Sequence, residues 1–179
     1  DDELISVEMT DGNNDVIIGT HNGLAIRFNE NDVRAMGRVT RGVKAITLKP
    51  GDYVVGMARV EEGSELMIVT ENGFGKKSEF SEFEPRNRGI MGVISHNITD
   101  KTGLLAGVAC VSDEDDVMII TDEGVIIRTD SSEIPTYKRS TTGVKIMRLD
   151  DGAIVANTTL VDKEEDEENE VALDENGNP

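Results

Sequence analysis

The chain has 179 residues, of which 37% are hydrophobic and 3% aromatic, with no tryptophan and a formal net charge of −18. A hydrophobic content this low and this poor in aromatic residues predicts small sheets that bury their faces against one another, and not one bulky core. The single cysteine, Cys110, excludes an internal disulfide framework and is expected to be a buried structural thiol. No run approaches the roughly 18 apolar residues of a membrane span, so we expect a cytoplasmic protein with no membrane partner.

The elements recur with a period near 50 residues, and each repeat opens with an acidic residue and a short apolar run. These runs of Val, Ile and Met are typical of buried strands, expected at residues 15–20, 65–70 and 116–121. Asn22-Gly23 and Asn72-Gly73 then predict type I′ hairpins, in which both central residues have positive φ, whereas Glu123-Gly124 is a weaker match. Second strands follow at residues 24–28, 74–78 and 125–129.

Each repeat continues with an irregular loop and two more strands. Third strands are expected at residues 43–48, 93–98 and 144–149, and fourth strands at 53–60, 104–111 and 153–161. Residues 4–9 are similar to a fourth strand whose own repeat is otherwise missing. Four strands on a period near 50, with almost no helical periodicity, predict an all-β protein of antiparallel four-stranded, propeller-like blades.

The repeats give five expected segments. They are the last strand of a preceding repeat (1–12), three blade repeats (13–62, 63–113 and 114–161) and a disordered acidic tail (162–179). Three blades leave open sheet edges at both ends, which predicts an open arc or strand exchange between copies.

Positive charge is concentrated at one place in each repeat. Segments 33–48, 85–99 and 134–149 contain no Asp or Glu, and each contains a Gly-Val pair, at Gly42, Gly92 and Gly143, which are 50 and 51 residues apart. Their candidate phosphate-binding cations are Arg34, Arg38, Arg41, Lys44, Arg86, Arg88, Lys138, Arg139 and Lys145. On stacked repeats such cations would lie side by side along one edge, where they could follow a charged polymer.

A second group of cations lies four residues after the hairpin glycine of each repeat. Arg27, Lys77 and Arg128 occupy this position, and Lys76 precedes the second of them. Equivalent positions on stacked sheets project from the same side. They are weaker candidates for binding, and an exposed charge at the rim is an equally good interpretation.

The cations predict binding to duplex DNA through phosphates, without sequence-specific contacts. Aromatic residues are too few to form stacking platforms for single strands, and any sequence preference would come from DNA deformability. The acidic tail would compete for the same cations as a tethered polyanion.

A convergent catalytic or metal-binding set is missing from the pattern. His21 and His96 have no Cys or His partner at metal-ligand spacing, so structural roles are expected, the first in a hairpin turn and the second on a strand. Tyr137, next to two cations, is a loop tyrosine in preference to a nucleophile. The acidic run at residues 113–116 lacks the spacing of a calcium loop and is expected to be a solvated turn. By itself, the chain is predicted not to be an enzyme.

The order and spacing of these motifs resemble the later part of the C-terminal domain of the DNA gyrase A protein, which belongs to a type IIA topoisomerase. The stretches that carry the resemblance are VRAMGRVTRGVKAITLKPGDYVVGMARV, ENGFGKKSEFSEFEPRNRGIMGVI and MIITDEGVIIRTDSSEIPTYKRSTTGVKIMRL. The resemblance extends from about Val7 to Val161 and implies the last three blades of a β-pinwheel of about six, with strands exchanged between neighbouring repeats.

The resemblance also implies a function. DNA would wrap around the basic perimeter and support negative supercoiling by a heterotetramer of the gyrase A and gyrase B proteins, in the bacterial cytoplasm and associated with the nucleoid. The ATP and Mg²⁺ of that holoenzyme would be bound elsewhere, so no cofactor is expected in this segment, and Tyr137 would not be the DNA-cleaving tyrosine.

One departure weakens the expected wrapping. The family's QRRGGKG-like gyrase A box is absent, and only scattered positions of it remain at residues 38–44 and 139–145. Two alternatives stay open: the equivalent domain of topoisomerase IV, which wraps DNA less, and a propeller that binds an acidic protein.

Overall fold

The computed structural model describes residues 3–163, and the structural statements below concern these residues. Its strands are β1 (Asp15–Thr20), β2 (Leu24–Asn29), β3 (Val54–Arg59), β4 (Glu65–Thr70), β5 (Phe74–Glu79), β6 (Val93–Ile94), β7 (Leu105–Val111), β8 (Asp115–Thr121), β9 (Ile126–Asp130), β10 (Val144–Lys145) and β11 (Val155–Asp162). One short 3-10 helix follows the second strand of each repeat: η1 (Glu30–Asp32), η2 (Phe80–Glu82) and η3 (Ser131–Glu133). Within the described range, no helix has the length and apolar character that crossing a membrane requires.

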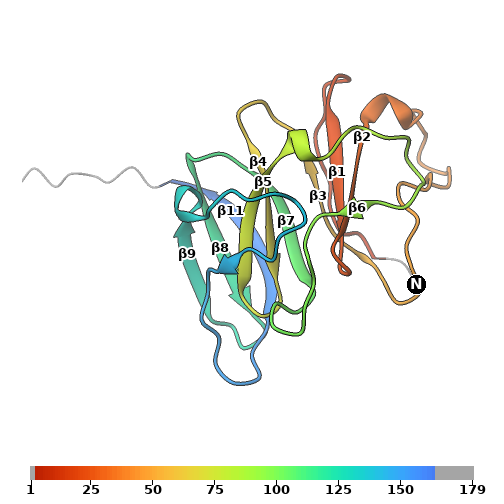
Figure 1. The fold of residues 1–179 in the computed structure, drawn as a ribbon. Helices are drawn as coiled ribbons and strands as arrows, with labels where there is room; N and C mark the ends of the chain where they lie inside the picture. The colour runs from red at the N-terminus through yellow and green to blue at the C-terminus, as the bar shows by residue number, and fades with distance from the viewer. Residues whose placement is uncertain (1–2, 164–179) are drawn as a thin grey trace, which may run out of the picture.

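The strands form three antiparallel sheets, and neighbouring repeats exchange a strand. The orders are β3-β1-β2-β6, β10-β5-β4-β7 and β11-β8-β9 (Figure 1). The second repeat supplies β6 to the first sheet, and the third repeat supplies β10 to the second. The exchange expected from the family resemblance is therefore present within this one chain.

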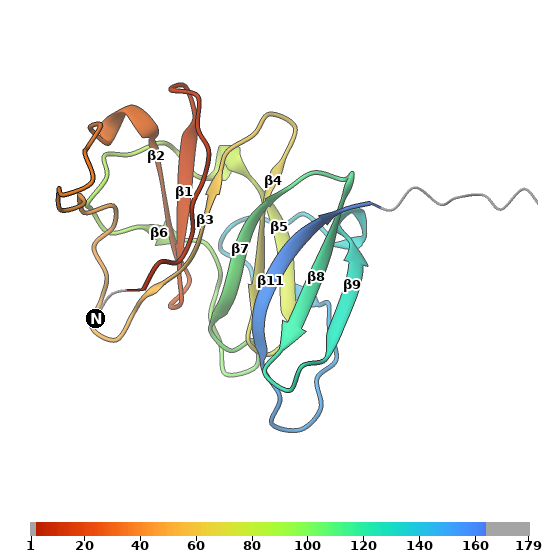
Figure 2. The same ribbon diagram turned by 180° about the vertical axis from the view of Figure 1, so that it is seen from behind.

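The sheets lie in a row, with their faces toward one another (Figures 1 and 2). Strand β7 lies between β3 and β11, so these three strands form the inner edge of the row. The side chains of β4 alternate between two cores: Leu66 and Ile68 pack with Ile17 of the first sheet, whereas Met67 and Val69 pack with Val117 of the third. The side-chain period of two along a strand thus lets the middle sheet join both neighbours.

The hairpin turns are not type I′. Gly23 has a φ of 79°, but no residue other than glycine has a positive φ in the described range. The Gly23 N–H donates to the carbonyl of Thr20 (3.0 Å), as in a type I turn that ends in a left-handed glycine. Gly73 and Gly124 make the same bond to Thr70 and Thr121. Only the glycine needs positive φ, so Glu123 fits this turn as well as asparagine does.

Four strand predictions were wrong or too long. Residues 4–9 and 43–48 form no strand, and the third strands at 93–98 and 144–149 shrink to the two-residue β6 and β10. The third sheet has three strands, not four, because β10 of the third repeat pairs with β5 of the second sheet. Residues 43–48 lie as a loop instead, held by the bond from the Thr47 N–H to the Ile90 carbonyl (2.9 Å). The reason is that a third strand pairs with the preceding repeat, and among the described residues no sheet edge of a preceding repeat faces residues 43–48.

The row of sheets is open, as expected, with the first and third sheets at opposite ends (Figures 1 and 2). Strand exchange between copies stays a prediction. Of the predicted tail, Asp162 is the last residue of β11, and residues 164–179 lie outside the described range.

Candidate nucleic-acid interface

The basic loops of the second and third repeats each lie on the second strand of the preceding repeat. The Arg86 N–H donates to the Arg27 carbonyl on β2 (2.8 Å), and the Tyr137 N–H donates to the Lys77 carbonyl on β5 (2.8 Å). These two bonds join equivalent residues. The backbone therefore places both loops in the same way, whatever side chains they carry.

The Gly-Val pair makes this close approach possible. A Cβ atom on Gly92 would lie 2.6 Å from the Ala25 carbonyl oxygen, and one on Gly143 would overlap the Gly75 carbonyl. Gly143 also has a φ of 66°, which other residues rarely adopt. The residues that follow pair with the same strands, as β6 on β2 and β10 on β5. Glycine thus fixes the point where each loop meets its sheet.

The three acid-free segments contact one another in series, and we call them together the basic band. The Gly89 N–H of the second segment donates to the Ala45 carbonyl of the first (2.6 Å). The Asn97 N–H of the second segment donates to the Thr141 carbonyl of the third (3.1 Å). Strands β6 and β10 end their sheets on the side opposite β3 and β7, so the band follows the outer edge of the row.

Seven of the nine predicted loop cations are exposed on this band. None of them is in an ion pair with another residue of the described range. They are Arg34, Arg38, Arg41, Lys44, Arg86, Lys138 and Lys145. Cations far apart in the sequence thus lie on neighbouring segments without local neutralisation.

Arg88 and Arg139 are half-buried residues whose guanidiniums bond to the main chain. Arg88 Nε donates to the Asp32 carbonyl (2.8 Å), and its Nη1 donates to the Lys44 carbonyl (3.1 Å). Arg139 Nη1 donates to the Ile94 carbonyl (2.7 Å). These two predicted phosphate ligands are engaged inside the band.

The second group of predicted cations is neutralised within its own sheets. Arg27 pairs with Asp15 (2.8 Å) and Arg128 with Asp116 (2.6 Å). Lys77, which is 4% exposed, pairs with Asp113 (2.6 Å) and Glu65 (3.3 Å). The acid that opens each repeat thus pairs with the cation of the second strand. This local pairing favours the structural interpretation of these three residues.

Lys76 is fully buried beneath the third segment. Its Nζ donates to the carbonyls of Lys138 (2.8 Å), Arg139 (2.6 Å) and Thr141 (3.1 Å). Burial lowers the pKa of this ammonium to about 8. A side chain in this position has no surface to offer a phosphate. The sequence indicated that this position is buried, because the equivalent residues of the first and third repeats are Ile26 and Ile127.

The histidines have structural surroundings. His21 stacks on Tyr53 with ring centroids 4.3 Å apart, and its Nδ1 lies 2.8 Å from the Leu105 carbonyl oxygen of the second sheet. His96 lies just after β6, not on a strand, and is buried. Both of its ring nitrogens lack a hydrogen-bond partner among the described residues. Burial, with a smaller effect of the Lys76 charge, lowers the pKa of His96 to about 4.

The acidic run and the loop tyrosine are also accounted for locally. Asp113 and Asp116 are in the ion pairs described above, and Asp115 accepts a hydrogen bond from the Ser112 N–H (2.7 Å). Residues 3–163 contain no group of three or more His, Cys, Asp or Glu side chains that could hold a metal ion. Tyr137 is 42% exposed on the third segment.

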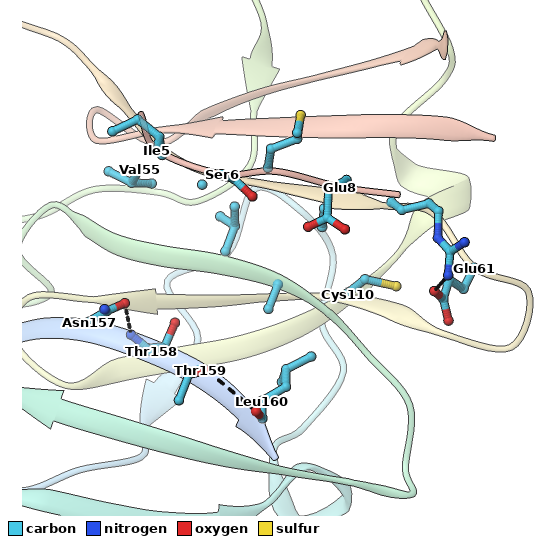
Figure 3. Close-up of a pocket in the computed structure, with 16 residues that line it drawn as sticks. Ile5, Ser6, Glu8, Val55, Glu61, Cys110, Asn157, Thr158, Thr159 and Leu160 are labelled. Carbon is cyan, nitrogen blue, oxygen red and sulfur yellow. Dashed lines mark hydrogen bonds and ion pairs between the residues drawn. The ribbon is translucent and has the colours of Figure 1, made fainter. Parts of the chain in front are cut away.

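A hollow of about 390 Å³ lies at the opposite, inner edge of the row. Ile5, Ser6, Glu8 and strands β3, β7 and β11 line it, and Figure 3 shows Cys110 and Thr158 among its side chains. Cys110 is half-buried, not fully buried as predicted, and burial raises the pKa of its thiol. The charged side chains on the wall are Glu8, Arg59 and Glu61, of which the last two pair with each other. The hollow has no convergent catalytic set and none of the basic segments.

Comparison with known proteins identifies the family of the chain. A family model described as the DNA gyrase C-terminal domain, a β-propeller, matches residues 14–61, 64–112 and 115–162. The DNA gyrase A protein of Staphylococcus epidermidis is 43% identical over 168 residues, which cover 93% of this chain and 19% of that protein. The chain thus spans about a fifth of this relative's length.

Two solved structures have a similar fold. The C-terminal domain of DNA topoisomerase IV superposes with a TM-score of 0.82 at 27% identity, covering 88% of this chain and 49% of that one. The DNA gyrase A C-terminal domain superposes with a TM-score of 0.77 at 29% identity, covering 83% and 50%.

Proposed function

Because the chain belongs to the DNA gyrase C-terminal domain family of β-propellers, we propose that it binds duplex DNA along the basic band and bends the duplex around the outer edge of the sheets. The supporting observation is the serial contact of three basic segments, for example from the Gly89 N–H to the Ala45 carbonyl (2.6 Å). Such contacts set cations from different repeats side by side. A polyanion that follows the edge would meet one repeat after another.

The proposed phosphate ligands are the seven exposed cations of the band. Contacts to phosphates alone give affinity without base readout, because every sequence has the same backbone charge. Binding should therefore weaken steeply as salt rises, since each neutralised phosphate releases a counterion. The paired cations Arg27, Lys77 and Arg128, and the buried Lys76, are not included.

The test is a titration of duplex DNA with this chain at several salt concentrations. Each phosphate contact contributes about 0.9 to the slope of log K against log salt. Replacing Arg34, Arg38 and Arg41 by Ala should lower this slope by about 2.7, whereas Arg27→Gln should leave it within about half a unit, because that side chain already pairs with Asp15. No binding, or an equal effect of both variants, would refute the proposal.

Wrapping is tested separately from binding. Relaxed circular DNA is incubated with the chain and a nicking-closing topoisomerase, the protein is removed and the linking number is measured. A shift that grows with protein concentration supports wrapping. If the linking number does not change although the chain binds DNA, the chain binds the duplex without wrapping it.

The related domain of topoisomerase IV is a second candidate, favoured by the TM-score of 0.82. The 43% identity to a DNA gyrase A protein favours the gyrase assignment. The linking-number assay separates the two, because the gyrase role requires the larger wrap. A propeller that binds an acidic protein would give no counterion-release slope with DNA.

In the larger protein, we propose that this domain guides DNA for a type II topoisomerase and is not catalytic itself. Cleavage, ATP binding and Mg²⁺ binding would then belong to the rest of the gyrase A protein and to the gyrase B protein, in a heterotetramer in the bacterial cytoplasm. Supercoiling by the reconstituted enzyme, with and without the triple Arg→Ala change, tests this role. Equal supercoiling by both enzymes would refute it.

A further inference from the structure

Arg88 and Arg139 occupy equivalent positions and make the same bond to the preceding repeat. Each lies four residues before its Gly-Val pair, at Gly92 and Gly143. Arg88 Nη1 donates to the carbonyl of Lys44, and Arg139 Nη1 donates to that of Ile94.

The two acceptors are equivalent as well, because each lies two residues after the Gly-Val glycine of its own repeat. A bond that recurs between the same two positions of successive repeats is set by the fold of the repeat. It is not an accident of one loop.

Each loop has a second attachment, at the 3-10 helix of the preceding repeat. Arg88 Nε donates to the carbonyl of Asp32, the last residue of η1. In the next repeat, the Arg139 N–H donates to the Glu82 carboxylate (3.5 Å), at the last residue of η2. Both arginines are therefore placed between the helix and the Gly-Val segment of the repeat before them.

We propose that Arg88 and Arg139 are positioning residues that clamp each basic segment onto the preceding repeat and so fix the spacing of the exposed cations. This inference rests on the proposed DNA binding for its consequence, but the clamp itself can be tested without DNA. Their charge contributes to the potential of the band, whereas Nε and Nη1 of Arg88 and Nη1 of Arg139 donate to main-chain carbonyls.

The chemistry of arginine explains the choice of residue. Its planar guanidinium presents N–H groups in different directions, so Arg88 reaches two carbonyls on separate elements at 2.8 and 3.1 Å. A lysine has the same charge but a single nitrogen, and cannot reproduce this fork. At position 88 an Arg→Lys change therefore separates the clamp from the charge, whereas the single side-chain bond of Arg139 is removed by Arg139→Ala.

Arg38 provides a matched control. It lies four residues before Gly42, but it is exposed, and its side chain makes no hydrogen bond or ion pair with another residue in the described range. An Arg38→Lys change therefore alters charge geometry at the equivalent position without breaking a clamp.

The first experiment is amide hydrogen exchange of the 179-residue chain without DNA. Arg139→Ala should speed the exchange of the Asn97 amide, which donates to Thr141, by tenfold or more. Arg88→Lys should do the same for the Gly89 amide, which donates to Ala45. Arg38→Lys and Arg38→Ala should change neither amide. Unchanged exchange in both clamp variants would overturn the proposal.

The second experiment measures duplex DNA binding by Arg88→Lys and Arg88→Gln. If Arg88 is a clamp, both variants lose affinity by a similar factor, several-fold, and their salt slopes stay within half a unit of the wild type. If it is a phosphate ligand, the lysine variant binds like wild type and the glutamine variant loses about 0.9 from the slope. That second pattern would overturn the proposal, as would faster exchange with no loss of affinity. Absence of DNA binding by the wild type would refute the proposed function alone, because the exchange experiment still decides the clamp.

Discussion

The Nζ nitrogen of Lys76 lies 2.6 Å from the carbonyl oxygen of Arg139, which is 63 residues further along the chain. A buried ammonium of the second repeat thus holds the backbone of the third repeat's basic segment. Two further carbonyls of the same segment accept from this nitrogen. The position of the exposed cations on this segment therefore depends on a buried cation, Lys76.

Replacing Lys76 by Met should release residues 138–141 with a modest effect on global stability. Three carbonyls lose their donor, which costs about 1–3 kcal/mol in the free energy of unfolding. Removal of the buried charge offsets part of this loss, because burial lowers the pKa of Lys76 to about 8. Trypsin cleavage after Lys138 and Arg139 should accelerate at least tenfold.

Ile26→Met, at the equivalent position of the first repeat, is the control and should leave the cleavage rate unchanged. Cleavage of the Lys76→Met variant at the wild-type rate would contradict the role of this ammonium. The buried charge also predicts a pH effect. The pKa is lower in the folded state than in the unfolded state, so wild type should gain stability relative to the variant between about pH 8 and 10.5.

The glycine of the Gly-Val pair is predicted to be essential only where the loop meets a sheet. Gly143→Ala places a methyl group against the Gly75 carbonyl and forces a non-glycine residue into a φ of 66°. We expect the free energy of unfolding to fall by about 1–3 kcal/mol in urea denaturation. Gly42→Ala should change it by less than about 0.5 kcal/mol, because nothing lies within 4 Å of the added atom. Equal effects at both sites would contradict this account.

The sequence predicted the strands that pair within a repeat better than the strand that is exchanged. First strands such as β1 and β4 are runs of apolar residues that pack on neighbouring sheets, and the glycine turn after each of them marks where a second strand begins. The two-residue strands β6 and β10 depend on backbone contacts with another repeat, which local sequence does not encode. The loop at 43–48 shows the consequence, because the same Gly-Val pattern forms no strand there.

The candidate site was predictable in its location but not in the role of each cation. The absence of acids marked the three segments of the band, and seven of their cations are exposed. Two signs of the structural cations were present in the sequence: the acid that opens each repeat, such as Asp15 for Arg27, and the apolar residues equivalent to Lys76. The clamps at Arg88 and Arg139 left no such sign, because their partners are backbone carbonyls.

His96 should make stability depend on pH in mildly acidic solution. Burial lowers its pKa to about 4 from 6.5, so between these values the unfolded chain binds a proton that the folded chain does not. Wild-type stability therefore falls as pH drops through this window. At pH 5.5 the cost is about 1 kcal/mol relative to neutral pH.

His96→Met tests this effect, because Met147 occupies the equivalent position of the third repeat and is buried. The variant should lack this part of the pH dependence in urea denaturation at pH 7.5 and 5.5. It should also be more stable than wild type at both pH values, since neither ring nitrogen has a hydrogen-bond partner among the described residues. Parallel pH profiles for the two proteins would contradict the prediction.

Removal of residues 164–179 should tighten DNA binding at low salt. These residues contain eight acids and no base, whereas Asp162 belongs to β11 and Lys163 pairs with Asp130 (2.8 Å), so a chain that ends at Lys163 keeps both. The tethered polyanion competes with phosphates for the band, and this competition is screened as the Debye length shortens. We expect affinity to rise several-fold at about 0.05 M salt, with the difference shrinking toward about 0.3 M.

A full-length chain with Gln or Asn at the eight acidic positions should bind like the shortened chain, because charge and not length causes the competition. If the neutral tail still weakens binding, excluded volume is responsible and the electrostatic explanation is wrong.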